Sequence, residues 1–335
     1  MSMNQPPSST LADSASSPGS VATWTQRANL STVTLVVSFL LMVIVFTLVT
    51  PYFFTVTNFV NIGQTLAVVG IVAIGETLVL IAGGVDISVG SVAALAGVTA
   101  SLLWNNDLLP IWWCVAAGLL SGVLVGLLNG LIVTRLKINP LITTLGMFSI
   151  IRGLAFVLSG GQTNQFQNEQ VQFLGRGNIA GIPFSLILML VLYGIFIYIL
   201  RQTFFGRNLY AIGGSAIASR LAGIAVNRHL MVVYILSGFF SALGGILIAS
   251  QLASGTPQAA VGLEFTVIAA VILGGTSLAG GKGTLIGTLV GVFILRTLDN
   301  GLILAGVSSY YQQVARGLVL LLAVGLDQIR IRLGR

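Results

Sequence analysis

Four charged residues lie inside long apolar stretches of this sequence: Glu76, Arg152, Arg296 and Arg316. A charged side chain in hydrocarbon is costly, so such residues pair with one another or mark a pathway for ions or solutes. Arg296 stands three residues before Asp299, a spacing that brings two side chains together on one helix face. Structural pairing and pathway lining are both open for these four charges.

The sequence offers no catalytic constellation around these charges. It has one cysteine, Cys114, and one histidine, His229, which excludes an internal disulfide, a multi-cysteine metal site and a histidine-pair metal motif. Paired carboxylates and a nucleophile beside a base are also absent from the pattern. We therefore expect no enzymatic activity, no metal and no cofactor.

A first glycine-rich stretch, residues 83–90 (GGVDISVG), interrupts the apolar pattern. Gly83 and Gly84 can end one helix, and Asp86 or Ser88 can cap the next by accepting backbone N–H bonds. The alternative interpretation is a broken helix beside a translocation pathway, because irregular backbone is tolerated in a membrane where it lines a cavity.

A second stretch, GGTSLAGGKGT, begins at Gly274, Gly275 and Thr276 and echoes the first. It superficially suggests a phosphate-binding loop. That motif requires Ser or Thr after its lysine, and here Gly283 follows Lys282. We expect no nucleotide at this stretch, and we assign it the same candidate role at a broken helix or pathway.

The elements that carry these residues must be membrane-spanning helices. The chain has 335 residues, of which 56% are hydrophobic and only 7% are charged, whereas soluble domains are about 25% charged. Hydrophobic runs that approach the length needed to cross a bilayer cover residues 30–50, 59–82, 87–104, 111–134, 138–160, 181–200, 230–252, 262–278, 284–298 and 309–327.

Basic residues orient these ten runs. With the N-terminus inside, the inner segments hold eleven Lys and Arg residues and the outer segments hold only Arg176, as the positive-inside rule requires. The formal net charge of +7 therefore reflects topology, and we expect no nucleic-acid partner. The predicted fold class is an all-α polytopic membrane protein with about ten transmembrane helices and cytoplasmic N- and C-termini.

The chain divides into a tail and one membrane domain. Residues 1–27 are rich in Ser and Pro, which predicts a disordered cytoplasmic tail. A signal peptide is disfavoured because no basic residue precedes the tail and the following run is long enough to span. Residues 28–335 form the predicted transmembrane domain.

Small residues recur every fourth position along three of the runs. Such ridges let helices approach closely, which favours packing within the chain over a dimer seam. The ridges are Gly118, Gly122, Gly126 and Gly130; Gly283, Gly287 and Gly291; and Ser237, Ser241 and Gly245.

The longest polar interruption after the tail is residues 201–229, which contain four arginines and no acid. Its centre carries Ile217, Leu221 and Ile224 at helical spacing, which predicts one short amphipathic helix. The segment is either a solvated connector or a helix that inserts into a groove of a cytoplasmic partner.

Taken together, four long stretches resemble the permease subunits of bacterial ATP-binding-cassette importers for ribose, xylose, arabinose and related sugars. The similar region runs from about Val49 to Asp327, and the Ser- and Pro-rich tail lies outside the family pattern. The stretches are ETLVLIAGGVDISVGS (76–91), NGLIVTRLKINPLITTLGMFSIIRGLAFVLSGGQ (129–162), GRNLYAIGGSAIASRLAGI (206–224) and AVILGGTSLAGGKGTLIGTLVGV (270–292).

The resemblance implies a multi-pass subunit of the bacterial inner membrane that imports a monosaccharide or sugar-like solute. It implies a second permease copy in a homodimer, a periplasmic sugar-binding protein, surrounding lipid, and a separate ATPase subunit on which ATP is hydrolysed. The 206–224 segment would couple the permease to that ATPase. The residues that would seat its short helix are Gly213, Ala218, Leu221, Gly223 and Ile224.

Two other classes of transporter remain open. An ion-coupled secondary transporter would use Glu76 as its coupling acid. A passive channel would need no cytoplasmic partner, so its flux would not depend on the 206–224 segment.

Overall fold

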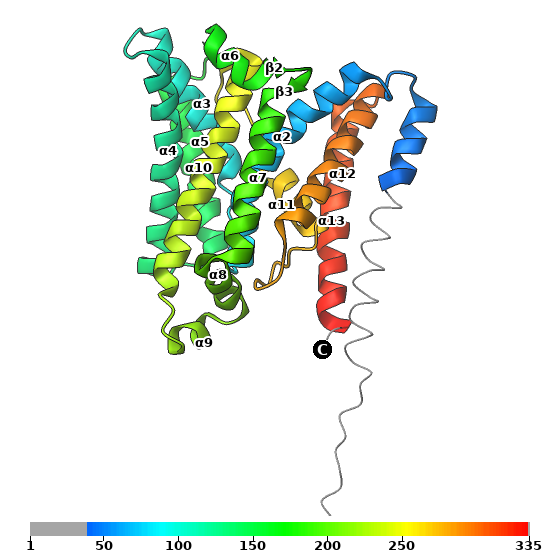
Figure 1. The fold of residues 1–335 in the computed structure, drawn as a ribbon. Coiled ribbons are helices and arrows are strands. Elements are labelled where there is room, and N and C mark those ends of the chain that lie inside the picture. The colour runs from blue at the N-terminus through cyan, green and yellow to red at the C-terminus, as the bar shows by residue number, and fades with distance from the viewer. Residues whose placement is uncertain (1–38, 334–335) are drawn as a thin grey trace, which may run out of the picture.

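The computed structural model describes residues 39–333, which form a bundle of mostly upright helices (Figure 1). The predicted tail 1–27 and the first part of the predicted span 30–50 lie outside the described residues. The remainder of that span is the apolar helix Phe39–Val49.

Each later hydrophobic run coincides with one helix, which confirms an all-α polytopic fold. Six helices of the described region are long and apolar enough to cross a membrane: α2, α4 together with the π-helical turn that follows it, α5, α7, α10 and α12. The nine helices on the predicted runs are α2 (Val56–Ile81), α3 (Val89–Asn105), α4 (Ile111–Leu131), α5 (Pro140–Ser159), α7 (Phe184–Gln202), α10 (Val226–Leu252), α11 (Leu263–Leu273), α12 (Leu285–Leu304) and α13 (Ser309–Leu333).

Short helices and strand pairs lie at the two ends of the bundle. The helix α6 (Glu169–Arg176) and two small antiparallel pairs lie at one end, and α8 (Phe204–Gly214) and α9 (Ala216–Leu221) lie at the other (Figure 1). The π-helical turn η1 (Ile132–Leu136) follows α4. The pairs join β1 (Asn164–Gln165) to β4 (Ser254–Gly255) and β2 (Asn178–Ile179) to β3 (Ile182–Pro183).

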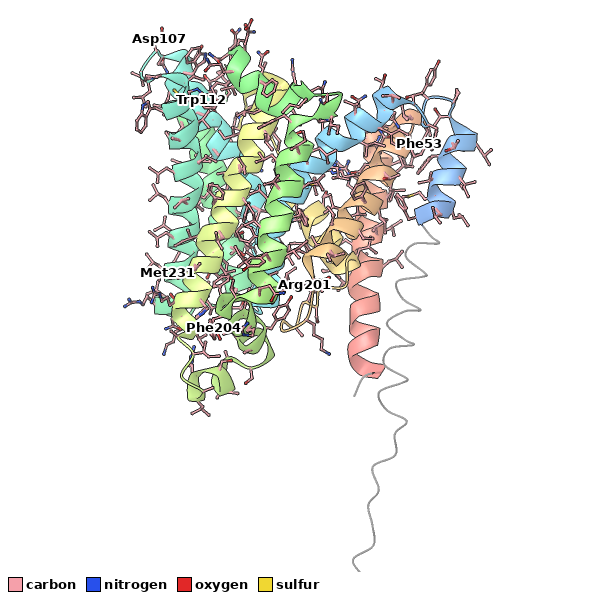
Figure 2. The ribbon with its side chains drawn as sticks, viewed as in Figure 1. Phe53, Asp107, Trp112, Arg201, Phe204 and Met231 are labelled. Atoms are coloured by element: carbon pink, nitrogen blue, oxygen red, sulfur yellow. The ribbon has the colours of Figure 1, made fainter. Side chains whose placement is uncertain are left out.

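The two ends differ in chemistry. Asp107 and Trp112 lie at the α6 end, whereas Arg201 and Phe204 lie at the α8 end, with Met231 nearby (Figure 2). Trp112 and its neighbour Trp113 are exposed, as expected for aromatic side chains at a membrane interface. The last described turn of α13 lies at the α8 end (Figure 1).

The centre of the bundle is α2. Thr55 caps it by accepting the N–H of Asn58 at 3.3 Å, and most of its 26 residues are buried. It packs against α7, α10, α11 and α12. Asn58 also exchanges side-chain hydrogen bonds of 3.0 and 2.8 Å with Asn300 of α12. A helix that is apolar on all sides is one that other helices surround.

The small-residue ridges pack within the chain, as the sequence predicts. On α4, Gly122 lies against Gly238 of α10, and Gly126 lies against the backbone of Tyr234 and Ile235. The glycines of α12 meet α11 in the same way. The contacts of Gly122 and Gly126 join α4 to α10, and these two helices form the most extensively packed pair in the bundle.

One predicted boundary and one predicted number of helices are wrong. The run 262–278 forms a helix only to Leu273, because Gly274 and Gly275 follow it, and Gly275 turns the chain with a φ of 90°. The segment 201–229 holds two helices instead of one short helix. Thr203 caps α8 by accepting the Gly206 N–H at 3.4 Å, and Ser215 caps α9 by accepting the Ala218 N–H at 3.2 Å.

Candidate functional site

A buried polar cluster forms where the chain passes from α2 to α3. The Asp86 carboxylate accepts hydrogen bonds from the Ser88 N–H at 3.0 Å, the Ser88 hydroxyl at 2.5 Å and the Ser237 hydroxyl at 2.7 Å. The Asp86 N–H donates to Glu76 Oε1 at 3.3 Å. Asn129 donates to the Ser88 hydroxyl at 3.0 Å. The cluster therefore ties α2, α3, α4 and α10 together in the interior.

This cluster shows a capping-type contact made by Asp86, and the pathway role of residues 83–90 stays a prediction. Asp86 holds the N–H of Ser88, the residue before α3, while the Ser88 side chain makes no cap of its own. Glu76 is fully buried, and its second carboxylate oxygen has no hydrogen-bond partner among the described residues. This cluster thus holds two acids, and of these two only Asp86 has a hydrogen-bond partner on both carboxylate oxygens.

The two glycine-rich stretches meet each other and α8, and we call this contact the glycine junction. The N–H of Gly281 donates to the carbonyl oxygen of Ile81 at 2.9 Å. Gly213, near the end of α8, lies so close to Ile81 and Gly281 that a side chain there would overlap both backbones. A Cβ on Gly280 would lie 2.8 Å from the Cα of Gly83. Helix α8 is therefore in direct backbone contact with both interruptions of the membrane helices.

The predicted residues Gly274 and Thr276 lie outside this junction. Gly274 packs against Gly287 at the start of α12. Thr276 is fully buried, and its hydroxyl has no partner within the part of the chain that the structure describes. Gly84 lies beside the buried hydroxyl of Tyr234, which is likewise unpartnered there.

Arg152 supports irregular backbone at membrane depth. Its Nη1 donates to the carbonyl oxygens of Pro257 and Ala259, each at 2.7 Å. These carbonyls belong to the segment that runs from β4 to α11, and α11 begins near mid-height of the bundle (Figure 1). Unpaired carbonyls are costly in hydrocarbon, so this arginine has a structural role that the sequence did not reveal.

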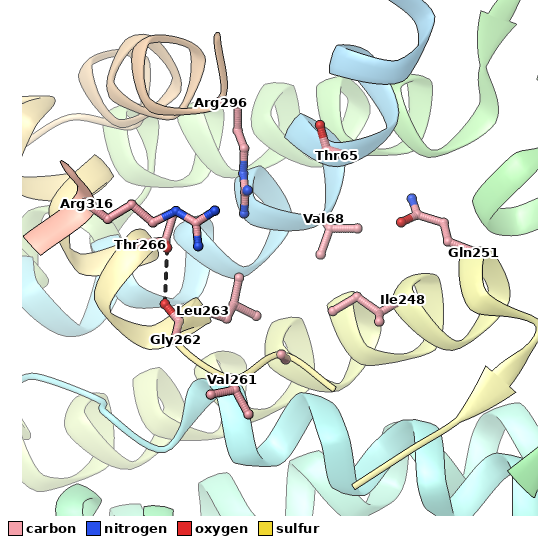
Figure 3. A pocket seen from close by; sticks show the side chains of 11 residues that line it. Thr65, Val68, Ile248, Gln251, Val261, Gly262, Leu263, Thr266, Arg296 and Arg316 are labelled. Carbon is pink, nitrogen blue, oxygen red and sulfur yellow. Dashed lines mark hydrogen bonds between the residues drawn. The ribbon is translucent and has the colours of Figure 1, made fainter. Parts of the chain in front are cut away.

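Arg296 and Arg316 share one carboxylate. Arg296 Nη1 donates to Asp299 Oδ2 at 3.0 Å, which confirms the predicted pairing, and Arg316 Nε of α13 donates to Asp299 Oδ1 at 2.9 Å. We call these three residues the outer ion-pair cluster. Two cations and one anion leave an excess positive charge. The two arginines also line a cavity of about 190 Å³ (Figure 3).

At the α8 end, α9 presents apolar side chains outward. Ile217 is 73% exposed and Leu221 is 86% exposed. Ala218 and Gly223 are exposed beside them, and Ile224 is half-buried. Of the five residues predicted to seat this segment on a partner, four therefore lie on or near the outer surface, and Gly213 lies in the glycine junction.

A basic groove adjoins α9. Its volume is about 630 Å³, and its lining includes Arg135, Arg220 and Arg228 together with Ile224 and Met231. None of the three arginines makes an ion pair with a side chain that the structure describes, which within residues 39–333 leaves out 323 and 326–333. Their unneutralised charge makes the groove a suitable surface for acidic groups.

Sequence reasoning missed Asn129 and Ser237 of the polar cluster and Gly280 and Gly281 of the junction. Ser237 had a signal of its own, because it begins a ridge of small residues. Its pairing with Asp86 spans 151 positions, however, and no local pattern encodes such a contact.

A family model and individual relatives both identify this chain as similar to permease components of transport systems. A family model described as "Branched-chain amino acid transport system / permease component" matches residues 58–324. The ribose import permease protein RbsC of Haemophilus influenzae is 40% identical over 295 residues, which cover 87% of this chain and 91% of that protein.

Two further relatives extend the likeness. RbsC of Bacillus subtilis is 40% identical over 290 residues, covering 86% of this chain and 90% of the relative. The L-arabinose transport system permease protein AraH of Escherichia coli is 41% identical over 280 residues, covering 84% and 85%. The chain therefore belongs to this family of permease components, among the sugar ABC importer permeases, as a multi-pass protein of the bacterial inner membrane.

Proposed function

We propose that this chain is the permease subunit of an ATP-driven, binding-protein-dependent importer for a monosaccharide. The observation that carries the proposal is the continuous path from the exposed apolar face of α9, through the α8 backbone, to the glycine junction. A displacement imposed on α9 from the cytoplasm acts on both interruptions of the membrane helices at once. This arrangement suits a transmission element.

The partner at this surface is a cytoplasmic ATPase subunit. The side chains of Ile217 and Leu221 offer an apolar anchor, and the neighbouring basic groove offers complementary charge for acidic residues around it. An apolar core with a charged rim is the composition of a typical protein interface. ATP hydrolysis then takes place on the partner, and this chain supplies the pathway.

The topology that fits this function has about ten transmembrane helices with both termini in the cytoplasm. The described part of the chain supports it, because α13 ends at the same end of the bundle as α8 and α9, which belong to the arginine-rich segment 201–229 (Figure 1). Residues 28–335 would form the membrane domain and 1–27 a cytoplasmic tail.

The substrate class follows the relatives, which include ribose and arabinose permeases. A periplasmic binding protein would deliver the sugar at the α6 end. Two permease copies, as a homodimer, would enclose the pathway. Gly83, Gly84, Asp86, Ser88, Gly274, Gly275 and Thr276 would then belong to the moving interruptions beside it.

One observation favours a second candidate, an ion-coupled transporter. Glu76 is buried, and one of its carboxylate oxygens has no partner in the described part of the chain, the condition expected of an acid that binds a proton or sodium ion. In that mechanism transport depends on an ion gradient, not on an ATPase.

The test is reconstitution of the permease in proteoliposomes with its cognate ATPase and binding protein. Leu221→Asp places a charge on an exposed apolar position, so the fold is retained while ATPase association is lost. The control is Leu108→Asp, the same change at an exposed position of the α6 end, which leaves association unchanged. Association with neither form, together with uptake driven by a pH or sodium gradient alone, would overturn the proposal in favour of the Glu76 mechanism.

A further inference from the structure

The outer cavity lies between five helices, each of which coincides with a predicted membrane-spanning run. Its walls come from α2, α10, α11, α12 and α13 and from the backbone of residues 260–262. Its volume of about 190 Å³ is far above the roughly 10–15 Å³ that one water needs. The cavity therefore has room for a small solute.

Hydrogen-bond donors gather on one side of this cavity. A guanidinium has five N–H donors, and the bonds to Asp299 use one from Arg296 and one from Arg316. Arg296 Nε is buried without a partner in the described region. In Figure 3 both guanidinium groups reach the open centre of the site. Several charged donors are therefore free to bind ligand oxygens.

Acceptors and an apolar wall complete the lining. Gln251 donates its amide to the Gln64 carbonyl at 3.3 Å, which leaves its own oxygen available. The Thr65 hydroxyl donates to the Asn61 carbonyl at 3.1 Å and keeps its lone pairs. Val68, Ile248 and Leu263 form an apolar surface around the site (Figure 3).

The backbone beside the cavity is irregular, as expected near a solute site in a membrane protein. Residues 260–262 are irregular, and α11 begins directly after them with 11 residues, about 16 Å of helix. Within a membrane, irregular backbone is tolerated where it lines a cavity. Half-helices of this kind border solute sites in transporters. The cavity therefore lies where the fold departs from continuous spans.

We propose that the outer cavity binds a neutral, polyhydroxylated ring, a monosaccharide, on its way through the permease. The proposal rests on the proposed function for its solute. A small inorganic anion would use the arginine donors alone. A sugar uses the donors, the Gln251 and Thr65 oxygens as acceptors, and the apolar wall for its C–H face. Arg296 and Arg316 bind the ring oxygens, and Asp299 positions both arginines.

The test introduces a second cysteine into a chain that has only one, Cys114. Cys114 is buried, so Val261→Cys, at a 71% exposed lining position, introduces a thiol that a small water-soluble reagent can label selectively. The purified permease is labelled with and without D-ribose. We expect saturating D-ribose to slow labelling at least about five-fold. Adding Arg316→Gln should raise the concentration for half-protection about ten-fold or more, because a hydrogen bond to a charged donor is lost.

Matched controls separate binding from indirect effects. Leu108→Cys, exposed outside the cavity, should label at the same rate with and without D-ribose. Thr65→Val should weaken protection, whereas Thr47→Val, which loses the same type of bond to a carbonyl four residues earlier, should not. Arg316→Gln keeps the Arg296–Asp299 pair, so the local fold is retained.

Each outcome has one meaning. Protection by sodium gluconate without protection by D-ribose would overturn the proposal in favour of an anion site. No protection by either solute, in a permease that carries out ATP-driven uptake, would overturn the cavity proposal alone. Protection by D-ribose in a permease that never associates with an ATPase would support the cavity and refute the proposed function.

Discussion

Replacing Gly213 by alanine tests the glycine junction directly. The new Cβ would overlap the Ile81 oxygen and the Gly281 nitrogen and would lie 3.0 Å from the Gly281 Cα. Overpacking of this kind costs about 1–3 kcal/mol, and separating Gly281 from Ile81 removes a hydrogen bond worth about 0.5–1.5 kcal/mol. The higher helix propensity of alanine offsets up to about 1 kcal/mol of this loss in the free energy of unfolding. The net expectation is a loss of about 2 kcal/mol in the free energy of unfolding.

The adjacent glycine provides the control. A Cβ on Gly214 meets no atom within 4 Å, so Gly214→Ala should leave stability unchanged or raise it by up to about 1 kcal/mol. Unfolding of both variants is followed by SDS titration in mixed micelles, and ATPase stimulation is measured in proteoliposomes. Only Gly213→Ala should lower both the free energy of unfolding and the ATPase stimulation. Equal stabilities for the two variants, within about 0.5 kcal/mol, would show that α8 does not pack on the junction as described.

Three further substitutions probe the buried polar groups. Asp299→Asn leaves both arginines of the outer ion-pair cluster unpaired and should lower the free energy of unfolding by about 2–4 kcal/mol, measured by SDS titration. Ser237→Ala removes a donor to the Asp86 carboxylate and should cost about 1.5–3 kcal/mol. The matched Ser241→Ala should stay within about 0.5 kcal/mol, because the buried Ser241 hydroxyl has no partner within residues 39–333; equal losses would contradict the cluster. Glu76→Gln should keep most binding-protein-stimulated sugar uptake, and complete loss of uptake with normal ATPase association would favour ion coupling.

The sequence was most informative about the long helices. Their positions follow from the lengths of apolar runs, and the small-residue ridges indicated close packing within the chain. Local chemistry also gave the Arg296–Asp299 pair, because a spacing of three residues determines proximity on a helix. Helix α8 was missed because its residues mix polar, aromatic and glycine side chains without an extended apolar period.

Contacts between distant segments were beyond local reasoning. Nothing near Asp86 in the sequence indicates Ser237, and nothing near Asp299 indicates Arg316, 17 residues later on another helix. Gly213 was predicted to help seat the short helix on a partner, which stays a prediction, and its backbone also packs on Ile81 and Gly281. Close approach of three backbones depends on how the helices are arranged in space, and a glycine looks the same in sequence whether it faces a partner or a neighbouring chain segment.

The shortness of α11 has a consequence for biogenesis. Its 11 residues extend about 16 Å, roughly half of the 30 Å hydrocarbon layer. The helix is therefore too short to insert by itself as a membrane-spanning segment during synthesis. The central helix α2, with 26 residues and a largely apolar sequence, can insert alone, before the helices that pack against it. We therefore expect helix α11 to enter together with α12, on which it packs, as a hairpin and after α2 is already in the membrane. The order in which the ribosome delivers these helices therefore matches the order in which the fold can accept them.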